Sequence, residues 1–242
     1  MVITKPNKKI SKIQTSNYYV AYLDFLGTKK FMLNDNNDEF MNKLYSLYYN
    51  TRQKILIDKF NFNKNAYLKI FSDNIILAVE VENDNKDKKN LSVLLRYVAN
   101  VYNSAIKQGL LIRGGISKGA FCIDNLMVGG QAHIEAVLLE ENIAVYPRIV
   151  TKKEVNDVLP NYFIKSEDGF YFLNNFMLIH SPDEIKKVRE NLLNMLRTCT
   201  DNKVFQKIMW VIHYFNEYFG GFYYPNNETP VIAEDEIIKM IK

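Results

Sequence analysis

The chain has 242 residues, enough for one large domain or for one domain with an extension. Hydrophobic residues make up 48% of it, so a sizeable core is available, and the net charge of +4 is a mild excess. A basic stretch at residues 5–12 is typical of a solvated lead-in rather than of a direct nucleic-acid site. We see no signal peptide and no apolar run near the ~20 residues of a membrane span. Cys122 and Cys199 are far apart and form no metal pattern, which fits a reduced, cytoplasmic protein.

The first part of the chain alternates strands and helices in a regular order. The patterns predict strands at residues 18–24, 66–71, 75–80 and 111–117, a shorter one at 120–123, and helices at 34–57 and 91–108. Ser72, Asp73 and Asn74 are good turn residues between the second and third strands. The order βαββαβ predicts an α+β, ferredoxin-like (palm-like) core, with an antiparallel-containing sheet and the helices on one face.

The later part is predicted to extend this core. We expect a helix at 130–141, strands at 148–150, 169–173 and 177–180, and helices from 182 to about 197 and from about 203 to 218. Ser181 and Glu184 have the spacing of an N-cap and a capping box. We therefore divide the chain into a lead-in at 1–17, a catalytic core at 18–165 and a packed extension at 166–242.

Two aspartates stand out because each lies at the end or the turn of an apolar strand. Asp24 ends the run Tyr-Val-Ala-Tyr-Leu-Asp, and Asp73 lies in Lys-Ile-Phe-Ser-Asp-Asn. A carboxylate in such a place costs free energy unless it is exposed, hydrogen-bonded or bound to a cation. In a βαββαβ core the two would meet and form an oxygen site for Mg²⁺ or Mn²⁺. The alternative is an ordinary strand cap and an ordinary turn aspartate.

Three further segments have residues suited to phosphate. Arg113 and Lys118 flank Gly114 and Gly115, and glycines in a strand permit close approach of a ligand or of another backbone. The alternative is a bulged strand with solvated cations. Gly130 precedes a helix, where a plain turn is as good an explanation as phosphate binding. Arg148 follows a proline and is a candidate for neutralising an α-phosphate.

With these residues in hand, the chain resembles the class III nucleotidyl cyclases, and in particular the Pycsar pyrimidine cyclases of bacterial antiphage defence. The resemblance covers roughly residues 18–216. It depends on Leu23-Asp24-Phe25-Leu26-Gly27, Lys69-Ile70-Phe71-Ser72-Asp73, Arg113-Gly114-Gly115-Ile116 with Gly119, Gly130 before Glu135-Ala136 and Leu139-Glu140, Tyr146-Pro147-Arg148-Ile149-Val150, and Lys207-Ile208-Met209-Trp210 with Tyr214 and Asn216.

The resemblance implies roles for several of these residues. Asp24 and Asp73 would hold a two-metal site of Mn²⁺ or Mg²⁺, with Phe25 contributing its carbonyl. Lys69, Tyr22 and Gly27 would lie in the nucleotide-binding site, although Lys69 also fits a surface lysine on an alternating strand.

One departure from the family concerns the transition state. The family's Asn and Arg on the helix after the glycine-rich strand correspond here to Ile134 and Leu138. Arg148, or else Arg113, would then take over the role of the missing arginine.

By this resemblance we expect a homodimer, with sites at the interface, that converts UTP to 3′,5′-cyclic UMP and pyrophosphate. The product would act on a separate effector that harms the infected cell. Alternatives are a cytidylate or adenylate cyclase, a palm-type oligonucleotide synthase, and an inactive cyclase-like module that binds a nucleotide or a partner.

Overall fold

The computed structural model describes seven stretches of the chain, and the predicted basic stretch at 5–12 lies outside them. The described residues are 14–28, 32–33, 38–61, 66–81, 87–124, 126–224 and 228–241.

The βαββαβ order predicted for the core is confirmed. Its elements are β1 (Ser16–Phe25), α2 (Asp38–Asn61), β2 (Ala66–Phe71), β3 (Asn74–Glu80), α3 (Asp87–Ile106) and β4 (Ile112–Ile123). The two strands expected at 111–117 and 120–123 are one continuous strand, because Gly119 and Ala120 stay in register with β1. Residues 34–37, at the expected start of the first helix, lie outside the described part.

A single mixed sheet runs through the molecule in the order β2-β3-β1-β4-β6-β8-β7, with β5 paired to β4. The remaining strands are β5 (Val128–Gly129), β6 (Ile149–Thr151), β7 (Phe163–Lys165) and β8 (Tyr171–Leu173). The β4–β6 pair is parallel, whereas β1 is antiparallel to both β3 and β4. As the central strand of the core, β1 places its C-terminal end between β3 and β4.

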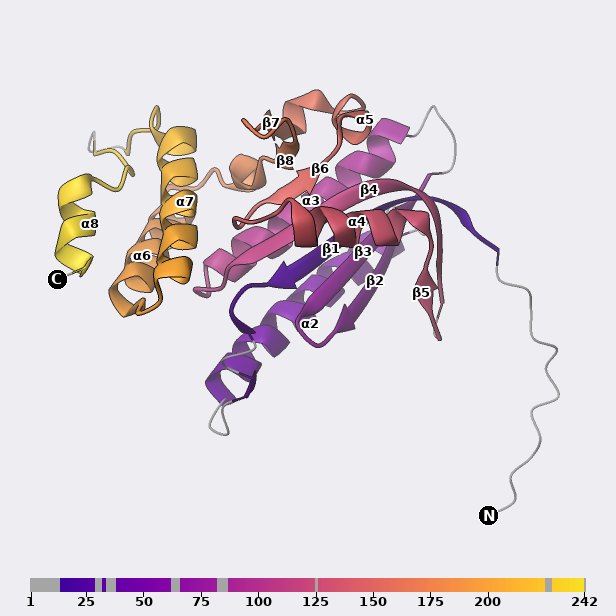
Figure 1. Ribbon diagram of the computed structural model, residues 1–242, viewed down its shortest axis with the longest axis horizontal. Coiled ribbons are helices and arrows are strands. Elements are labelled where there is room, and N and C mark those ends of the chain that lie inside the picture. Colours follow the sequence, from indigo (N-terminus) through magenta and orange to yellow (C-terminus); the bar gives the residue numbers. More distant parts are fainter. Residues whose placement is uncertain are drawn as a thin grey trace, which may run out of the picture.

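Helices cover both faces of this sheet (Figure 1). Tyr19, Ala21 and Leu23 pack with α2 and α3 in the main core, as predicted for the crossover helices. The alternate residues of β1 face the other way, where Val20 clusters with Ala132 of α4 (Gln131–Asn142). The two helices of the βαββαβ order share one face, as predicted, and α4, which follows that order, covers the other face. Strand alternation gives both faces of β1 an apolar side, and each needs a cover.

The C-terminal part packs against α3. It contains α5 (Lys153–Asn156), η2 (Pro160–Tyr162), η3 (Asn175–Leu178), α6 (Pro182–Thr198), α7 (Asn202–Phe219) and α8 (Glu234–Ile241). Asn103 of α3 donates a hydrogen bond to the carbonyl of Asn175 at 2.8 Å, and Phe176 packs against Tyr102. The extension is thus tied to the core through buried contacts.

Three expectations for this part are corrected. A strand was expected at residues 177–180, but Met177 and Leu178 belong to the η3 turn. In this turn the ring of Phe176 stacks on that of Tyr214. Ser181 occupies the N-cap position without a side-chain cap hydrogen bond. Glu184 pairs with Lys107 of the core rather than closing a capping box. The helix α8 was not predicted.

Candidate functional site

The backbone brings the two aspartates together at the end of β1. Asp24 is paired with Asn74 on one side and with Arg113 on the other. The amide of the next residue, Phe25, donates a hydrogen bond to the carbonyl of Asp73 at 3.2 Å. The turn between β2 and β3 is therefore bonded directly to the end of β1, as the βαββαβ order predicted.

The turn itself has an unusual backbone conformation. Ser72 has φ 55°, in the left-handed region that non-glycine residues seldom adopt. The hydroxyl of Tyr48, on α2, donates to the Ser72 carbonyl at 2.9 Å. This bond, together with the Phe25 amide, holds the turn in the shape that presents Asp73.

Polar side chains orient Asp73 from two sides. The hydroxyl of Thr28 donates to Asp73 Oδ2 and lies 3.3 Å from the carbonyl oxygen of Phe25. The amide of Asn74 donates to Asp73 Oδ1 at 3.3 Å, and Tyr22 donates to Asn74 Oδ1 at 2.6 Å. Thr28 and Asn74 were missed as site residues by sequence reasoning. Their positions next to the two motifs are the signal that was present.

Arg113 lies between two carboxylates. Its Nε is 3.4 Å from Asp24 Oδ2 and 2.6 Å from Oε1 of Glu140 on α4. Burial raises the pKa of Glu140 to about 7, with Arg113 opposing the shift and Asp24 adding to it. Burial also raises the pKa of Asp24, again against Arg113, while the negative charge of Asp73 adds to the rise. The site therefore concentrates negative charge that one guanidinium only partly balances.

The oxygen atoms here fit a hard divalent cation. The described residues contain no group of three or more His, Cys, Asp or Glu side chains suited to a metal. The donor set is instead Asp24 and Asp73 with the neutral oxygens of Phe25 and Thr28. Oxygen-only sets suit Mg²⁺ and Mn²⁺, and a cation would offset the burial and the nearby charge of Asp73 that raise the pKa of Asp24.

Tyr22 and Lys69 share the sheet face of the aspartates. Ile76 of β3 is paired with Tyr22 on one side and with Lys69 on the other, so the three lie in one row across the sheet. Gly27 follows in the turn after β1 with φ 81°, and open space surrounds the place of a Cβ.

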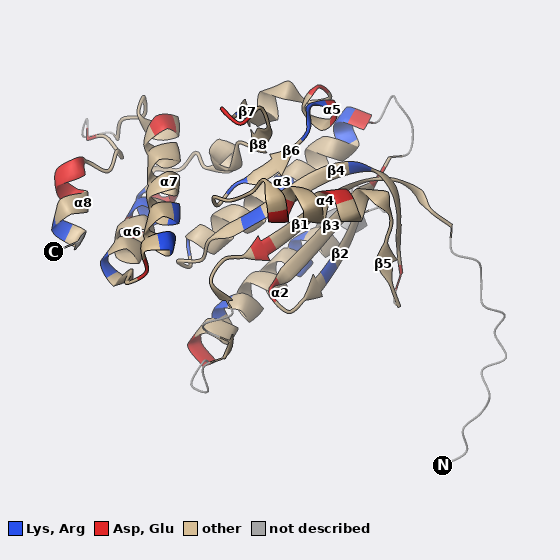
Figure 2. Ribbon diagram, viewed as in Figure 1, with Lys and Arg blue, Asp and Glu red and all other residues tan. Residues whose placement is uncertain are grey.

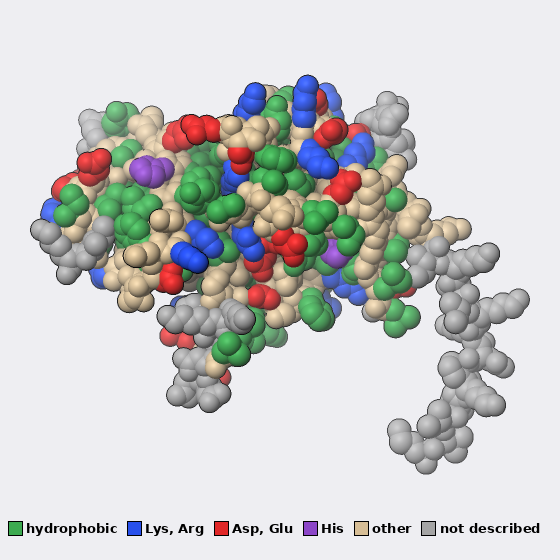
Figure 3. All heavy atoms as spheres, in the orientation of Figure 1, with side chains coloured by type: hydrophobic (Ala, Val, Ile, Leu, Met, Phe, Trp, Pro, Cys, Tyr) green, Lys and Arg blue, Asp and Glu red, His purple; other side chains and the backbone are tan. Residues whose placement is uncertain are grey.

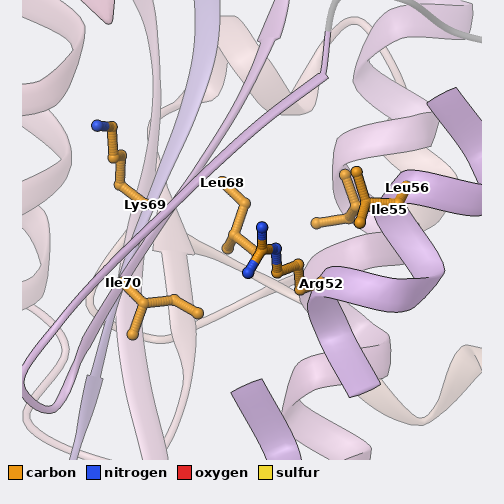
Figure 4. A pocket seen from close by; sticks show the side chains of 6 residues that line it. All are labelled: Arg52, Ile55, Leu56, Leu68, Lys69 and Ile70. Atoms are coloured by element: carbon orange, nitrogen blue, oxygen red, sulfur yellow. The ribbon is translucent and has the colours of Figure 1, made fainter. Parts of the chain in front are cut away.

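A cavity of about 320 Å³ lies on the opposite face, between α2 and β2 (Figure 4). It is lined by Arg52, Ile55, Leu56, Leu68, Lys69 and Ile70. In Figure 4 the side chain of Lys69 points away from Leu68 and Arg52. The cavity is thus separated by the sheet from the aspartate pair.

Arg148 is not brought to the aspartates in this chain. Its side chain is only 5% exposed and donates to Ser166 at 2.7 Å, to the Ile143 carbonyl at 2.9 Å and to Asp168. These contacts fasten β6 to the loop between β7 and β8.

The two positions that match the family's Asn and Arg lie on the outer side of α4. Ile134 is 56% exposed and Leu138 is 50% exposed. Neither side chain has a polar atom, so neither position offers a donor to a phosphate.

Gly115 of β4 serves the packing of α4. A Cβ on Gly115 would lie 2.1 Å from the Ala136 carbonyl oxygen and 2.7 Å from Leu139 Cβ. The sequence suggested that either a ligand or another backbone approaches this glycine, and the structure shows the backbone of α4 there. This approach also brings Glu140 within reach of Arg113.

Comparisons with known proteins find structural similarity alone. No family model matches the chain, and no curated protein matches it. The guanylyl cyclase domain of the RhoGC fusion protein from the aquatic fungus Blastocladiella emersonii is 14% identical, with a TM-score of 0.49 over 68% of this chain and 98% of that one. The catalytic core of a rhodopsin-guanylyl cyclase with converted specificity, in complex with ATPαS, is 16% identical, with a TM-score of 0.49 over 66% and 96%. A class III adenylyl cyclase-like ATP-binding protein from Pseudomonas aeruginosa is 10% identical, with a TM-score of 0.46 over 87% and 47%.

Proposed function

We propose that this protein is a nucleotidyl cyclase that forms 3′,5′-cyclic UMP and pyrophosphate from UTP. The observation that carries the proposal is the hydrogen bond from the Phe25 amide to the Asp73 carbonyl, which joins the two acidic motifs at one place. The motif resemblance supports the same activity. The choice of UTP, and a role of the product as a messenger to a separate effector in antiphage defence, depend on that resemblance.

In the proposed reaction the ribose 3′-hydroxyl loses its proton and its oxygen bonds to the α-phosphorus. The bond from the α-phosphorus to the bridging oxygen breaks, and pyrophosphate leaves with the electron pair. Mg²⁺ or Mn²⁺ held by Asp24, Asp73 and the Phe25 carbonyl would activate the hydroxyl and stabilise the leaving charge. Thr28 and Asn74 fix the orientation of the Asp73 carboxylate by donating to its two oxygens.

Arg113 is the arginine we assign to the phosphates. It lies beside Asp24, whereas Arg148 is occupied by Asp168 and Ser166. A guanidinium with several donors suits the charge that develops on a transferring phosphoryl group. The earlier preference for Arg148 has no supporting contact in this chain.

The test is product formation from each nucleoside triphosphate with Mn²⁺, followed by mass spectrometry. We expect cyclic UMP from the wild type and a fall of at least about 100-fold in Asp73→Ala, because metal-assisted charge stabilisation is worth several kcal/mol. Asp183→Ala is the matched control, since Asp183 is an exposed aspartate on α6. Cyclic CMP or cyclic AMP would change the substrate, whereas linear or 2′-linked products would indicate an oligonucleotide synthase.

A second candidate is an inactive cyclase-like module that binds a nucleotide. The exposed apolar side chains at Ile134 and Leu138 favour it, because the helix lacks the polar pair of the family. Nucleotide binding that depends on Mn²⁺, without a product from any substrate, would support this candidate over the cyclase.

A further inference from the structure

The helix α7 of the extension lies against the part of the core next to the site. Trp210 stacks on Tyr146, with ring centroids 5.8 Å apart and an angle of 11° between the rings. Tyr146 belongs to the loop that joins α4 to β6. Residues three apart on a helix are neighbours on one side of it, so this contact turns Lys207 toward the core as well.

Lys207 lies near enough to the site for its charge to act on it. Partial burial lowers the pKa of Lys207, Arg113 lowers it further, and Asp24 raises it. The effect is mutual, because Lys207 is also among the groups that lower the pKa of Asp24.

Charged groups of both signs meet in this region. Figure 2 shows basic positions on the side of α7 that faces the end of β1, where an acidic position lies. Figure 3 shows blue and red side chains side by side on the surface between α7 and α4. These charged side chains are therefore exposed on this face.

The ammonium group of Lys207 has no fixed carboxylate partner among the described residues, taking 4.0 Å as the limit of an ion pair. A partly buried cation without a partner costs free energy, and an anionic ligand would recover it. A lysine ammonium binds phosphate as a compact point charge. Arg113 is shared with Glu140, and Lys207 is a second cation near it that no carboxylate of the described residues holds in an ion pair.

We propose that Lys207 binds the polyphosphate of the nucleotide, so that the C-terminal extension completes the substrate site of the core. The inference deepens the proposed function and depends on it for the identity of the ligand. It gives α7 a part in phosphate binding beside that of Arg113 on β4.

The experiment measures binding by calorimetry in the presence of Mn²⁺. The probes are 3′-deoxy-UTP, which lacks the attacking hydroxyl, and inorganic tripolyphosphate, which lacks the nucleoside. We expect Lys207→Ala and Lys207→Met to weaken both probes about tenfold, which equals about 1.4 kcal/mol, because each removes a charge-assisted contact. Lys207→Arg should restore most of the affinity.

Two controls separate a contact from a general loss of positive charge or of folding. Lys187→Ala removes an exposed lysine from α6, and Lys203→Ala removes an exposed lysine one turn before Lys207. Both should bind the probes as the wild type does. The midpoint of thermal unfolding checks that each Lys207 variant is folded, and the methionine variant keeps most of the side-chain volume.

The outcomes distinguish this inference from the proposed function. A wild type that binds 3′-deoxy-UTP but makes no cyclic product refutes the cyclase. The ratio of the affinities of the wild type and the Lys207 variants for this probe still decides the role of Lys207. A wild type that forms cyclic product, with folded Lys207 variants that bind both probes normally, refutes the role of Lys207 alone. A tenfold loss in Lys203→Ala as well would reduce the effect to general charge, and a wild type that binds neither probe overturns both proposals.

Discussion

Arg113 connects the chemistry of the site to its stability. Its guanidinium contacts the aspartate at the end of β1 and a glutamate of α4 that is 3% exposed. A buried carboxylate next to one shared cation is held less firmly in its charged form than in water. Glu140 therefore changes protonation near neutral pH, while the contact with Arg113 keeps α4 in place.

This leads to a prediction for stability against pH. The pKa of Glu140 in the folded protein, about 7, is above its ordinary value of 4.5. The folded state therefore holds the proton more tightly, and this contribution is fully present below about 4.5 and is lost as the pH rises through about 7. Urea unfolding at several pH values should show the loss, about 3.5 kcal/mol at most, since one pKa unit is worth about 1.4 kcal/mol.

Glu140→Gln should flatten this slope whatever it does to the absolute stability. Glu190→Gln, which changes an exposed glutamate on α6, should leave the slope as it is in the wild type. An equal slope in the wild type and in Glu140→Gln would mean that another group causes the pH dependence.

At the scale of elements, the seat of α4 on β4 is the critical contact. The helix backbone lies so close to Gly115 that a methyl group would overlap the Ala136 carbonyl. At Gly119 of the same strand, the nearest atoms to an added methyl group are 3.7 Å away, which is an ordinary contact.

We therefore predict that Gly115→Ala lowers the free energy of unfolding by about 1–3 kcal/mol, the usual cost of overpacking. It should also reduce cyclase activity, because α4 carries the partner of Arg113. Gly119→Ala should change both far less. Urea denaturation and product assays on the two variants check this, and equal stability of both would show that α4 adjusts without cost.

Much of the element level could be predicted, and the failures have local causes. Alternating apolar residues and the Ser72–Asn74 turn identify β1, β2 and β3, and hence the meeting of Asp24 with Asp73. The face taken by α4 could not be predicted, because it depends on which side of the sheet is still uncovered.

Contacts between distant residues account for the remaining misses. Glu184 has the spacing of a capping box, yet its carboxylate pairs with Lys107, which follows α3. Arg148 follows a proline in a motif that suggested a role at the α-phosphate. The carboxylate that binds its guanidinium lies 20 positions further along the chain.

At the scale of the whole molecule, the extension and the core form one body. A buried hydrogen bond joins α3 to η3, and Arg148, next to β6, donates to Asp168. The ring of Trp210 stacks on that of Tyr146. No helix of the described part is long and apolar enough to cross a membrane. Among the large apolar side chains that the described part leaves exposed are Ile134 and Leu138, on the outer side of α4.

We predict that this side of α4 takes part in the proposed homodimer. Leu138→Glu should then shift the protein toward the monomer in light scattering and lower its specific activity, because exposed apolar side chains in an interface do not tolerate a charge. Ile238→Glu, at an equally exposed position on α8, is the control. A wild type whose specific activity is independent of dilution and whose mass is that of one chain would contradict the dimer.

The stack of Trp210 on Tyr146 also has a practical consequence, because the chain contains one tryptophan. Its indole fluorescence comes from a single place, the contact between α7 and the loop before β6. This contact lies about one helical turn from Lys207. Separation of the extension from the core, or arrival of a polyanion beside that lysine, would each alter the surroundings of this one fluorophore. The protein thus carries its own optical reporter at the boundary between its two parts.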